Sequence, residues 1–173
     1  LIYLDHRGCG RSSGEQETWH LDQWADDLAL FCKMLGIDSP IVFGQSFGGM
    51  VAMHFAARNP SGLSKLILSS TAAQFRLDET VKIMRKLGGE RAAEVSHQFF
   101  SNPSQGAYDT YGEVCLPLYS NPNAPEANAF RERAIERPEV AIHFFASEMA
   151  SMDMRAEIAN ITCPTLVIGG TLD

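Results

Sequence analysis

A serine enclosed by glycines joins an apolar run to a helical pattern, and this junction constrains the fold more than any other segment. The run at residues 41–43 is typical of a buried strand. Residues 50–56 carry apolar side chains at helical spacing, and Asn59-Pro60 ends that pattern. The glycines in Gly44-Gln45-Ser46-Phe47-Gly48 therefore predict a tight turn from a strand into a helix rather than a flexible loop.

Four short apolar segments are typical of buried strands. Each is a short, mostly apolar run of the kind that a buried strand of a parallel sheet has. They occupy residues 1–4, 41–43, 66–68 and 164–168. The first three alternate with helical patterns, and this order predicts a parallel sheet covered by helices.

Two regions have helical rather than strand character. Residues 21–35 place apolar side chains at steps of three and four, with Thr18 as the expected N-terminal cap and Gly36 as the expected end. Residues 73–156 contain helical stretches broken by prolines and no convincing strand, and a long insertion of this kind predicts a lid. We therefore expect three parts: a first part of the core at 1–72, a helical lid at 73–156 and a late strand of the core at 157–173.

Composition and charge exclude several kinds of partner and site. The 173 residues include 21 acidic and 14 basic side chains, and the net charge of -7 disfavours nucleic acid and anionic membranes. No apolar run reaches the ~18 residues that a membrane-spanning helix needs. The four cysteines form no C-x-x-C pair, so a zinc site is disfavoured and reduced thiols in a cytoplasmic protein are favoured over a disulfide.

Ser46 has the surroundings that a nucleophilic serine requires. A serine hydroxyl reacts poorly at neutral pH unless a base lies beside it and a hydrogen-bond donor meets the oxyanion that forms. Gly44 to Gly48 matches G-x-S-x-G, in which the residues two before and two after the serine must be small. The turn would place Ser46 at a helix N-terminus, where the backbone N–H of Phe47 is the expected oxyanion donor.

Three separated segments resemble the α/β-hydrolase fold family. Residues 5–12 resemble its D-x-R-G-x-G-x-S loop, residues 44–49 its nucleophile elbow, and residues 163–173 the late strand that ends in its triad acid. The likeness is closest to the proline iminopeptidase branch, although that branch usually has tryptophan or tyrosine where this chain has Phe47. The resemblance implies an α/β-hydrolase fold, a parallel sheet with flanking helices and a helical lid insertion, and no metal or organic cofactor.

The resemblance implies a Ser-His-Asp triad of which this chain carries two members. Ser46 would be the nucleophile and Asp173 the acid, and in the family's order the histidine follows the acid. All five histidines precede Asp173: they are His6, His20, His54, His97 and His143. We therefore expect a chain truncated at both ends and inactive by itself, with His6 the first candidate if a local histidine serves as base.

The resemblance also implies a substrate class. A proline iminopeptidase-like enzyme would release an N-terminal amino acid from small peptides, with Gln45 beside the serine and Glu148 in the lid as candidate substrate-binding residues. Glu148 would meet the free amine of the substrate. Two alternatives stay open: a carboxylic-ester or carbon–carbon bond hydrolase of the same fold, and a catalytically inactive binding module. The partner is expected to be a small molecule or short peptide, and the oligomeric state stays open.

Overall fold

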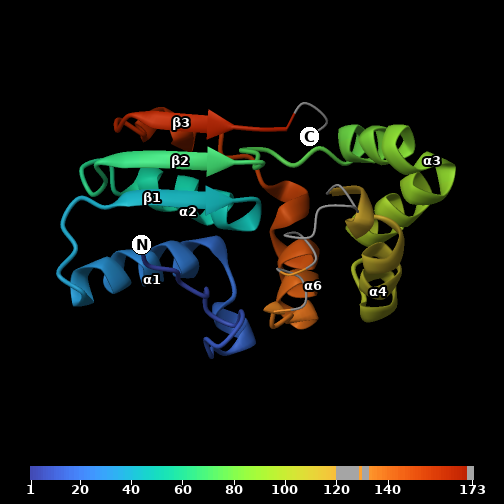
Figure 1. Ribbon diagram of the computed structural model, residues 1–173, viewed down its shortest axis with the longest axis horizontal. Coiled ribbons are helices and arrows are strands. Elements are labelled where there is room, and N and C mark those ends of the chain that lie inside the picture. The colour runs from blue at the N-terminus through green and yellow to red at the C-terminus, as the bar shows by residue number, and fades with distance from the viewer. Residues whose placement is uncertain (120–128, 130–132, 171–173) are drawn as a thin grey trace. The chain divides into compact units, whose positions relative to one another are not determined.

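The computed structural model describes residues 1–119, 129 and 133–170 (Figure 1). The chain forms two compact units. The sheet unit consists of Glu17–Phe75 with Met152–Asp173, and the helical unit consists of Leu1–Gln16 with Arg76–Ser151. The division follows contacts within each unit, with boundaries at residues 75/76 and 151/152. The lid at 73–156 stays a prediction.

The sheet unit contains a parallel three-stranded sheet. Its strands are β1 (Ile41–Gln45), β2 (Lys65–Ser69) and β3 (Thr165–Ile168), in the order β1-β2-β3. Gly44 pairs with Leu68 in the first ladder and Leu68 with Val167 in the second. Three of the four predicted strands are confirmed, together with the parallel direction that the alternation of strands and helices predicted.

One helix packs directly on the sheet and a second packs on that helix. They are α2 (Phe47–Arg58), which lies behind the strands in Figure 1, and α1 (Leu21–Met34). The short helix η4 (Glu157–Asn160) also contacts α2. Trp24 of α1, Val51 of α2 and Leu66 of β2 are fully buried and form the centre of this core. The helix expected after Ser46 is confirmed, including its end at Asn59.

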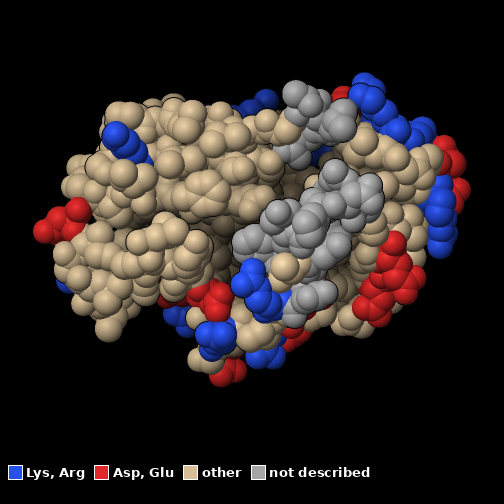
Figure 2. Space-filling view, viewed as in Figure 1, with Lys and Arg blue, Asp and Glu red and all other residues tan. Residues whose placement is uncertain are grey.

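The opposite face of the sheet is apolar and exposed. Alternate residues of β1 and β3 present their side chains there, because side chains alternate between the two faces of a strand. Phe43 is 59% exposed, and Ile41, Leu166 and Ile168 are exposed as well. Figure 2 shows that this side of the strands carries almost no charged side chains.

The start of α1 differs from the prediction that Thr18 caps it. Thr18 ends a short helix, η1 (Gln16–Thr18), and the N-cap of α1 is His20, whose Nδ1 accepts from the Gln23 N–H at 3.2 Å. An imidazole nitrogen in an extended backbone position satisfies an orphan amide as a serine oxygen would. Gly36, with φ 63°, follows the helix as expected.

The predicted strand at residues 1–4 is wrong. Residues 1–6 form no strand, and Leu1, Ile2 and Tyr3 are exposed. A parallel strand requires a neighbour that pairs with its backbone, and the ladders of the described sheet pair only β1 with β2 and β2 with β3.

The helical unit has its own core. It contains α3 (Leu77–Ser101), α4 (Gln105–Val114), η2 (Leu116–Tyr119), α6 (Pro138–Ser147) and η3 (Met149–Ser151). Phe99 of α3, Tyr111 of α4 and Cys115, which follows α4, are buried in one cluster. The predicted helical character of this region is confirmed for the described residues, none of whose helices is long and apolar enough to cross a membrane.

α3 is interrupted at Gly89. This residue has φ 72° and ψ -167°, so two helical segments meet there without continuing the helix. The left-handed φ suits glycine, which has no Cβ to clash with the following carbonyl. Arg85 and Glu90 bridge the interruption with two hydrogen bonds, of 2.8 and 3.0 Å.

Candidate active site

Ser46 lies between the last residue of β1 and the first residue of α2. Its backbone has φ 49° and ψ -120°, which a residue with a Cβ rarely adopts. The side chain is exposed and makes no capping hydrogen bond to the helix that it precedes. The hydroxyl is therefore accessible and is not used to terminate α2.

Backbone contacts from two elements hold Ser46 in this conformation. Its N–H donates to the carbonyl of Ser69 at the end of β2, over 3.0 Å. Its carbonyl oxygen accepts from the N–H groups of Gly49 at 2.9 Å and Met50 at 3.2 Å. The Thr71 hydroxyl donates to the same carbonyl oxygen at 2.8 Å. The turn is thus fixed by α2 on one side and by the segment after β2 on the other.

Two glycines permit the close approach of these elements. A Cβ on Gly44 would lie 2.7 Å from the carbonyl carbon of Gly48 and from Cα of Gly49, a separation that real Cβ atoms do not show. A Cβ on Gly49 would lie 2.6 Å from Cβ and Cγ2 of Thr71. The sequence prediction that the position two before the serine must be small is confirmed, since backbone of α2 occupies the space.

Phe47 begins α2 and packs on the core of the sheet unit. Its ring meets the indole of Trp24 edge to face, with centroids 4.8 Å apart. Trp24 is fully buried, so Phe47 rests on a fixed partner. The first N–H groups of a helix have no acceptor within the helix and carry the positive end of its dipole. The backbone at Phe47 is thus suited to an anionic oxygen.

The glycine-rich loop at residues 5–12 is organised around Asp5. The carboxylate accepts from the Arg11 N–H at 3.1 Å, and the Ser12 hydroxyl donates to the Asp5 carbonyl at 2.7 Å. Gly10 has φ 54°, and a Cβ there would lie 2.5 Å from the carboxylate carbon. Burial, and then the carboxylates of Asp5 and Glu139, raise the pKa of the Cys9 thiol above its ordinary value. Cys9 is therefore held as a neutral thiol in this loop.

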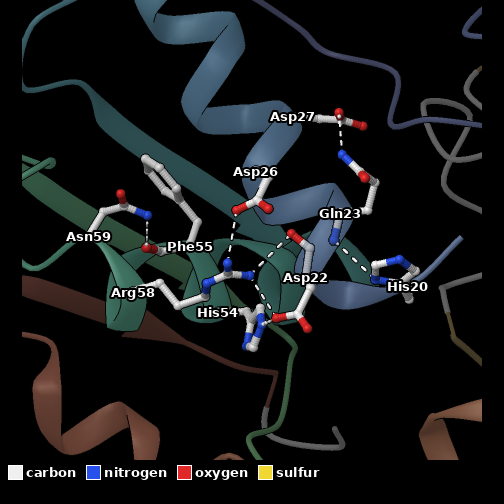
Figure 3. A network of polar contacts seen from close by, with 9 residues as sticks. All are labelled: His20, Asp22, Gln23, Asp26, Asp27, His54, Phe55, Arg58 and Asn59. Atoms are coloured by element: carbon white, nitrogen blue, oxygen red, sulfur yellow. Dashed lines mark hydrogen bonds and ion pairs between the residues drawn. The ribbon is translucent and has the colours of Figure 1, made fainter. Parts of the chain in front are cut away.

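His54 belongs to a polar network on the sides of α1 and α2 (Figure 3). Its Nε2 lies 2.8 Å from Oδ1 of Asp22, which Nη1 of Arg58 contacts at 2.7 Å. The hydrogen bond with His54, and then the charge of Arg58, hold the pKa of Asp22 below its ordinary value. His54 thus joins α2 to α1 through the carboxylate that Arg58 also contacts.

The predicted site residues fall into three groups. One turn brings Gln45, Ser46 and Phe47 together, and Gln45 is the exposed last residue of β1. Glu148 is the half-buried residue after α6 in the helical unit, and its N–H donates to the Phe144 carbonyl at 3.0 Å. Asp173 lies outside the described residues.

Sequence reasoning missed two residues that hold the turn, Ser69 and Thr71. Both contact the backbone of Ser46 from the segment after β2. The run Ser69-Ser70-Thr71 directly after an apolar strand was the available signal, because parallel strands of one sheet end at the same edge. Among the residues that the structure describes, no three histidine, cysteine or acidic side chains are grouped as a metal site.

The sequence of this chain is similar to those of known proteins. A family model described as alpha/beta hydrolase fold matches residues 1–173. A proline iminopeptidase of Clostridium botulinum (strain Hall) is 28% identical over 190 aligned residues, which cover 100% of this chain and 64% of the relative. A proline iminopeptidase of Lactobacillus delbrueckii subsp. lactis is 35% identical over 137 residues, which cover 73% of this chain and 47% of the relative.

Solved structures show the same arrangement of elements. A thermophilic esterase from Thermogutta terrifontis superposes with a TM-score of 0.64 at 26% sequence identity, covering 95% of this chain and 59% of that chain. The chain thus spans less than two thirds of the length of each of these three relatives.

Proposed function

The chain belongs to the alpha/beta hydrolase fold family, and from this we propose that it is part of a serine hydrolase that releases an N-terminal amino acid from small peptides. Ser46 is the nucleophile and Asp173 the acid of a Ser-His-Asp triad. The general base is a histidine outside the 173 residues. The predicted fold, a parallel sheet with flanking helices, agrees with the family match.

The observation that carries this proposal is the exposed Ser46, which has a positive φ and directly precedes α2. The Ser46 hydroxyl attacks the carbonyl carbon of the substrate while the histidine accepts its proton. The carbonyl oxygen becomes an oxyanion, which the Phe47 N–H and the α2 dipole stabilise. The histidine then protonates the leaving amine, and water hydrolyses the acyl-enzyme by the same steps in reverse order. Asp173 orients the imidazole and stabilises its charged form.

The relatives support a peptide substrate with a free amine. Those reported from Clostridium botulinum and Lactobacillus delbrueckii are both named proline iminopeptidase. An enzyme that acts at the N-terminus of a peptide binds an ammonium group, and a buried ammonium requires a carboxylate partner. We assign that role to Glu148, and assign contact with the acyl part of the substrate to Gln45, which is exposed beside Ser46.

One observation favours a second candidate function. The 26% identity with the esterase from Thermogutta terrifontis extends over 95% of this chain, so an ester or carbon–carbon bond hydrolase is the alternative. The elbow geometry serves both reactions equally, because each passes through an oxyanion at the attacked carbonyl. A catalytically inactive binding module is the alternative that is not an enzyme. The four free thiols agree with the cytoplasmic location that we propose.

The full-length protein tests these alternatives with three substrates. We expect it to cleave L-proline p-nitroanilide, to spare the N-acetylated anilide, and to lose both anilide and p-nitrophenyl acetate hydrolysis by more than about a thousandfold in Ser46→Ala. Cleavage of the ester but not of the free-amine anilide would instead establish the esterase. Binding of proline anilide without turnover of either substrate would establish the binding module.

A further inference from the structure

Ser46 depends on one side chain that no part of the proposed triad includes. The Thr71 hydroxyl donates to the Ser46 carbonyl oxygen at 2.8 Å, from a segment 25 residues later in the chain. The remaining contacts of that carbonyl come from backbone N–H groups of α2. We infer that Thr71 is a positioning residue: by holding the Ser46 carbonyl, it fixes the direction of the Phe47 N–H, the oxyanion donor. This inference rests on the proposed function.

The connection runs through a single peptide unit. The Ser46 carbonyl and the Phe47 N–H belong to the same planar group, and no peptide bond of the described chain is cis. In a trans peptide the N–H points opposite to the carbonyl oxygen. Whatever fixes the direction of the Ser46 carbonyl therefore fixes the direction of the Phe47 N–H, which is the proposed oxyanion donor.

The backbone of Ser46 needs such a restraint. A residue with a Cβ at φ 49° and ψ -120° is strained, and it keeps that conformation only where its surroundings determine it fully. Rotation about ψ would turn the Ser46 carbonyl and the Phe47 N–H together. The Thr71 bond opposes that rotation from outside α2, whereas the bonds from Gly49 and Met50 come from the helix itself.

Packing holds the Thr71 hydroxyl in place. The Cβ and Cγ2 of Thr71 would lie 2.6 Å, and its Oγ1 2.7 Å, from a Cβ on Gly49, so the Thr71 side chain packs against Cα of that glycine. A β-branched residue has few χ1 rotamers, and the close contact with Gly49 restricts them further; in the rotamer present the hydroxyl meets the Ser46 carbonyl. An O–H donated to a carbonyl also polarises the peptide and strengthens its N–H as a donor.

A matched pair of variants separates the hydroxyl from the packing. Thr71→Val keeps the branched shape and removes the hydroxyl, whereas Thr71→Ser keeps the hydroxyl and removes the methyl group. In the full-length protein we expect Thr71→Val to lower kcat about tenfold for p-nitrophenyl acetate, with KM within twofold, because an interaction made only in the transition state is lost. A trifluoromethyl ketone inhibitor should weaken by the same factor, and Thr71→Ser should keep both values within threefold.

Ser46→Ala in the same assays separates this inference from the proposed function. Activity that survives Ser46→Ala overturns the assignment of Ser46 and, with it, the role of Thr71. Activity that Ser46→Ala abolishes but Thr71→Val keeps at the wild-type kcat overturns the role of Thr71 alone. If Thr71→Val and Thr71→Ser lowered kcat equally, and their melting temperatures fell in parallel, Thr71 would be a packing residue. That result would overturn the inference as well.

Discussion

The imidazole of His54 and the carboxylate of Asp22 form a hydrogen bond of 2.8 Å between α2 and α1. His54 is the histidine nearest to Ser46 in the sequence, eight residues later, and its Nε2 is engaged in this bond. The pair instead joins two helices of the sheet unit, with Arg58 on the same carboxylate. Its contribution is to stability.

The first prediction concerns the pH dependence of that pair. Because the pKa of Asp22 is lowered from 3.8 in the folded protein, the unfolded chain binds more protons there at acidic pH. The stabilisation is present above pH 3.8 and is lost as the pH falls through the lowered pKa. The Asp22 side chain is 65% exposed, so we expect Asp22→Asn to cost no more than about 1 kcal/mol at pH 7.

Urea denaturation at several pH values checks this expectation. Trp19 and Trp24 both belong to the sheet unit, so tryptophan fluorescence reports on it. The wild type and Asp22→Asn should converge below pH 3.8. Asp26→Asn is the control, because Asp26 contacts Arg58 at 3.0 Å and leaves the His54 pair intact. A difference between wild type and Asp22→Asn that stayed constant with pH would contradict the linkage.

The second prediction concerns the N-terminal cap of α1. His20→Ala removes the acceptor of the Gln23 N–H, and loss of a cap costs roughly 1 kcal/mol. His20→Asn supplies another acceptor and should restore most of that stability. A urea midpoint of His20→Ala equal to that of the wild type would show that the cap contributes nothing.

The third prediction concerns the turn itself. Gly44→Ala places a Cβ against backbone of α2, which cannot rotate away, and we expect a loss of at least about 2 kcal/mol in the sheet unit. Gly112→Ala is the control: it lies inside α4, nothing lies within 4 Å of its added Cβ, and it should stabilise the helix by about 1 kcal/mol. Thermal unfolding measures both. A melting temperature of Gly44→Ala equal to the wild type would refute the elbow geometry.

The fourth prediction concerns Glu148 and the amine of the substrate. Glu148→Gln keeps the size of the side chain and removes its charge, so kcat/KM for proline anilide should fall at least about tenfold, while p-nitrophenyl acetate is hydrolysed nearly as before. Glu94→Gln, an exposed position of the same unit, is the control. Parallel losses on both substrates would make Glu148 structural. No loss on either would move the proposal to another lid carboxylate, such as Glu113 or Glu136.

Local patterns predicted most of the sheet unit. The strand before Ser46, the helix after it and the strands at β2 and β3 have apolar runs or helical spacing bounded by glycine and proline, and each was found close to its predicted residues. Residues 1–4 have the same apolar character but form no strand. Apolar composition indicates a preference for burial, whereas a strand also depends on a partner elsewhere in the chain.

The sequence predicted only those parts of the candidate site whose residues are neighbours along the chain. Gly44 and Ser46 follow from the turn, since the small side chain and the tight bend have one local cause. The bond from Thr71 to Ser46 joins residues 25 positions apart and has no periodicity to reveal it. The same limit applies to His20, because capping by an imidazole depends on its rotamer rather than on residue type alone.

The interruption of α3 at Gly89 has a consequence for local unfolding. The first amides of a helical segment have no acceptor within it, so we expect those of residues 90–92 to exchange with deuterium faster than amides deeper in either segment. The second segment carries Phe99 into the core, whereas the first buries mainly Met84. We therefore expect α3 to open from its middle, as two cooperative units of unequal lifetime that the Arg85–Glu90 ion pair links.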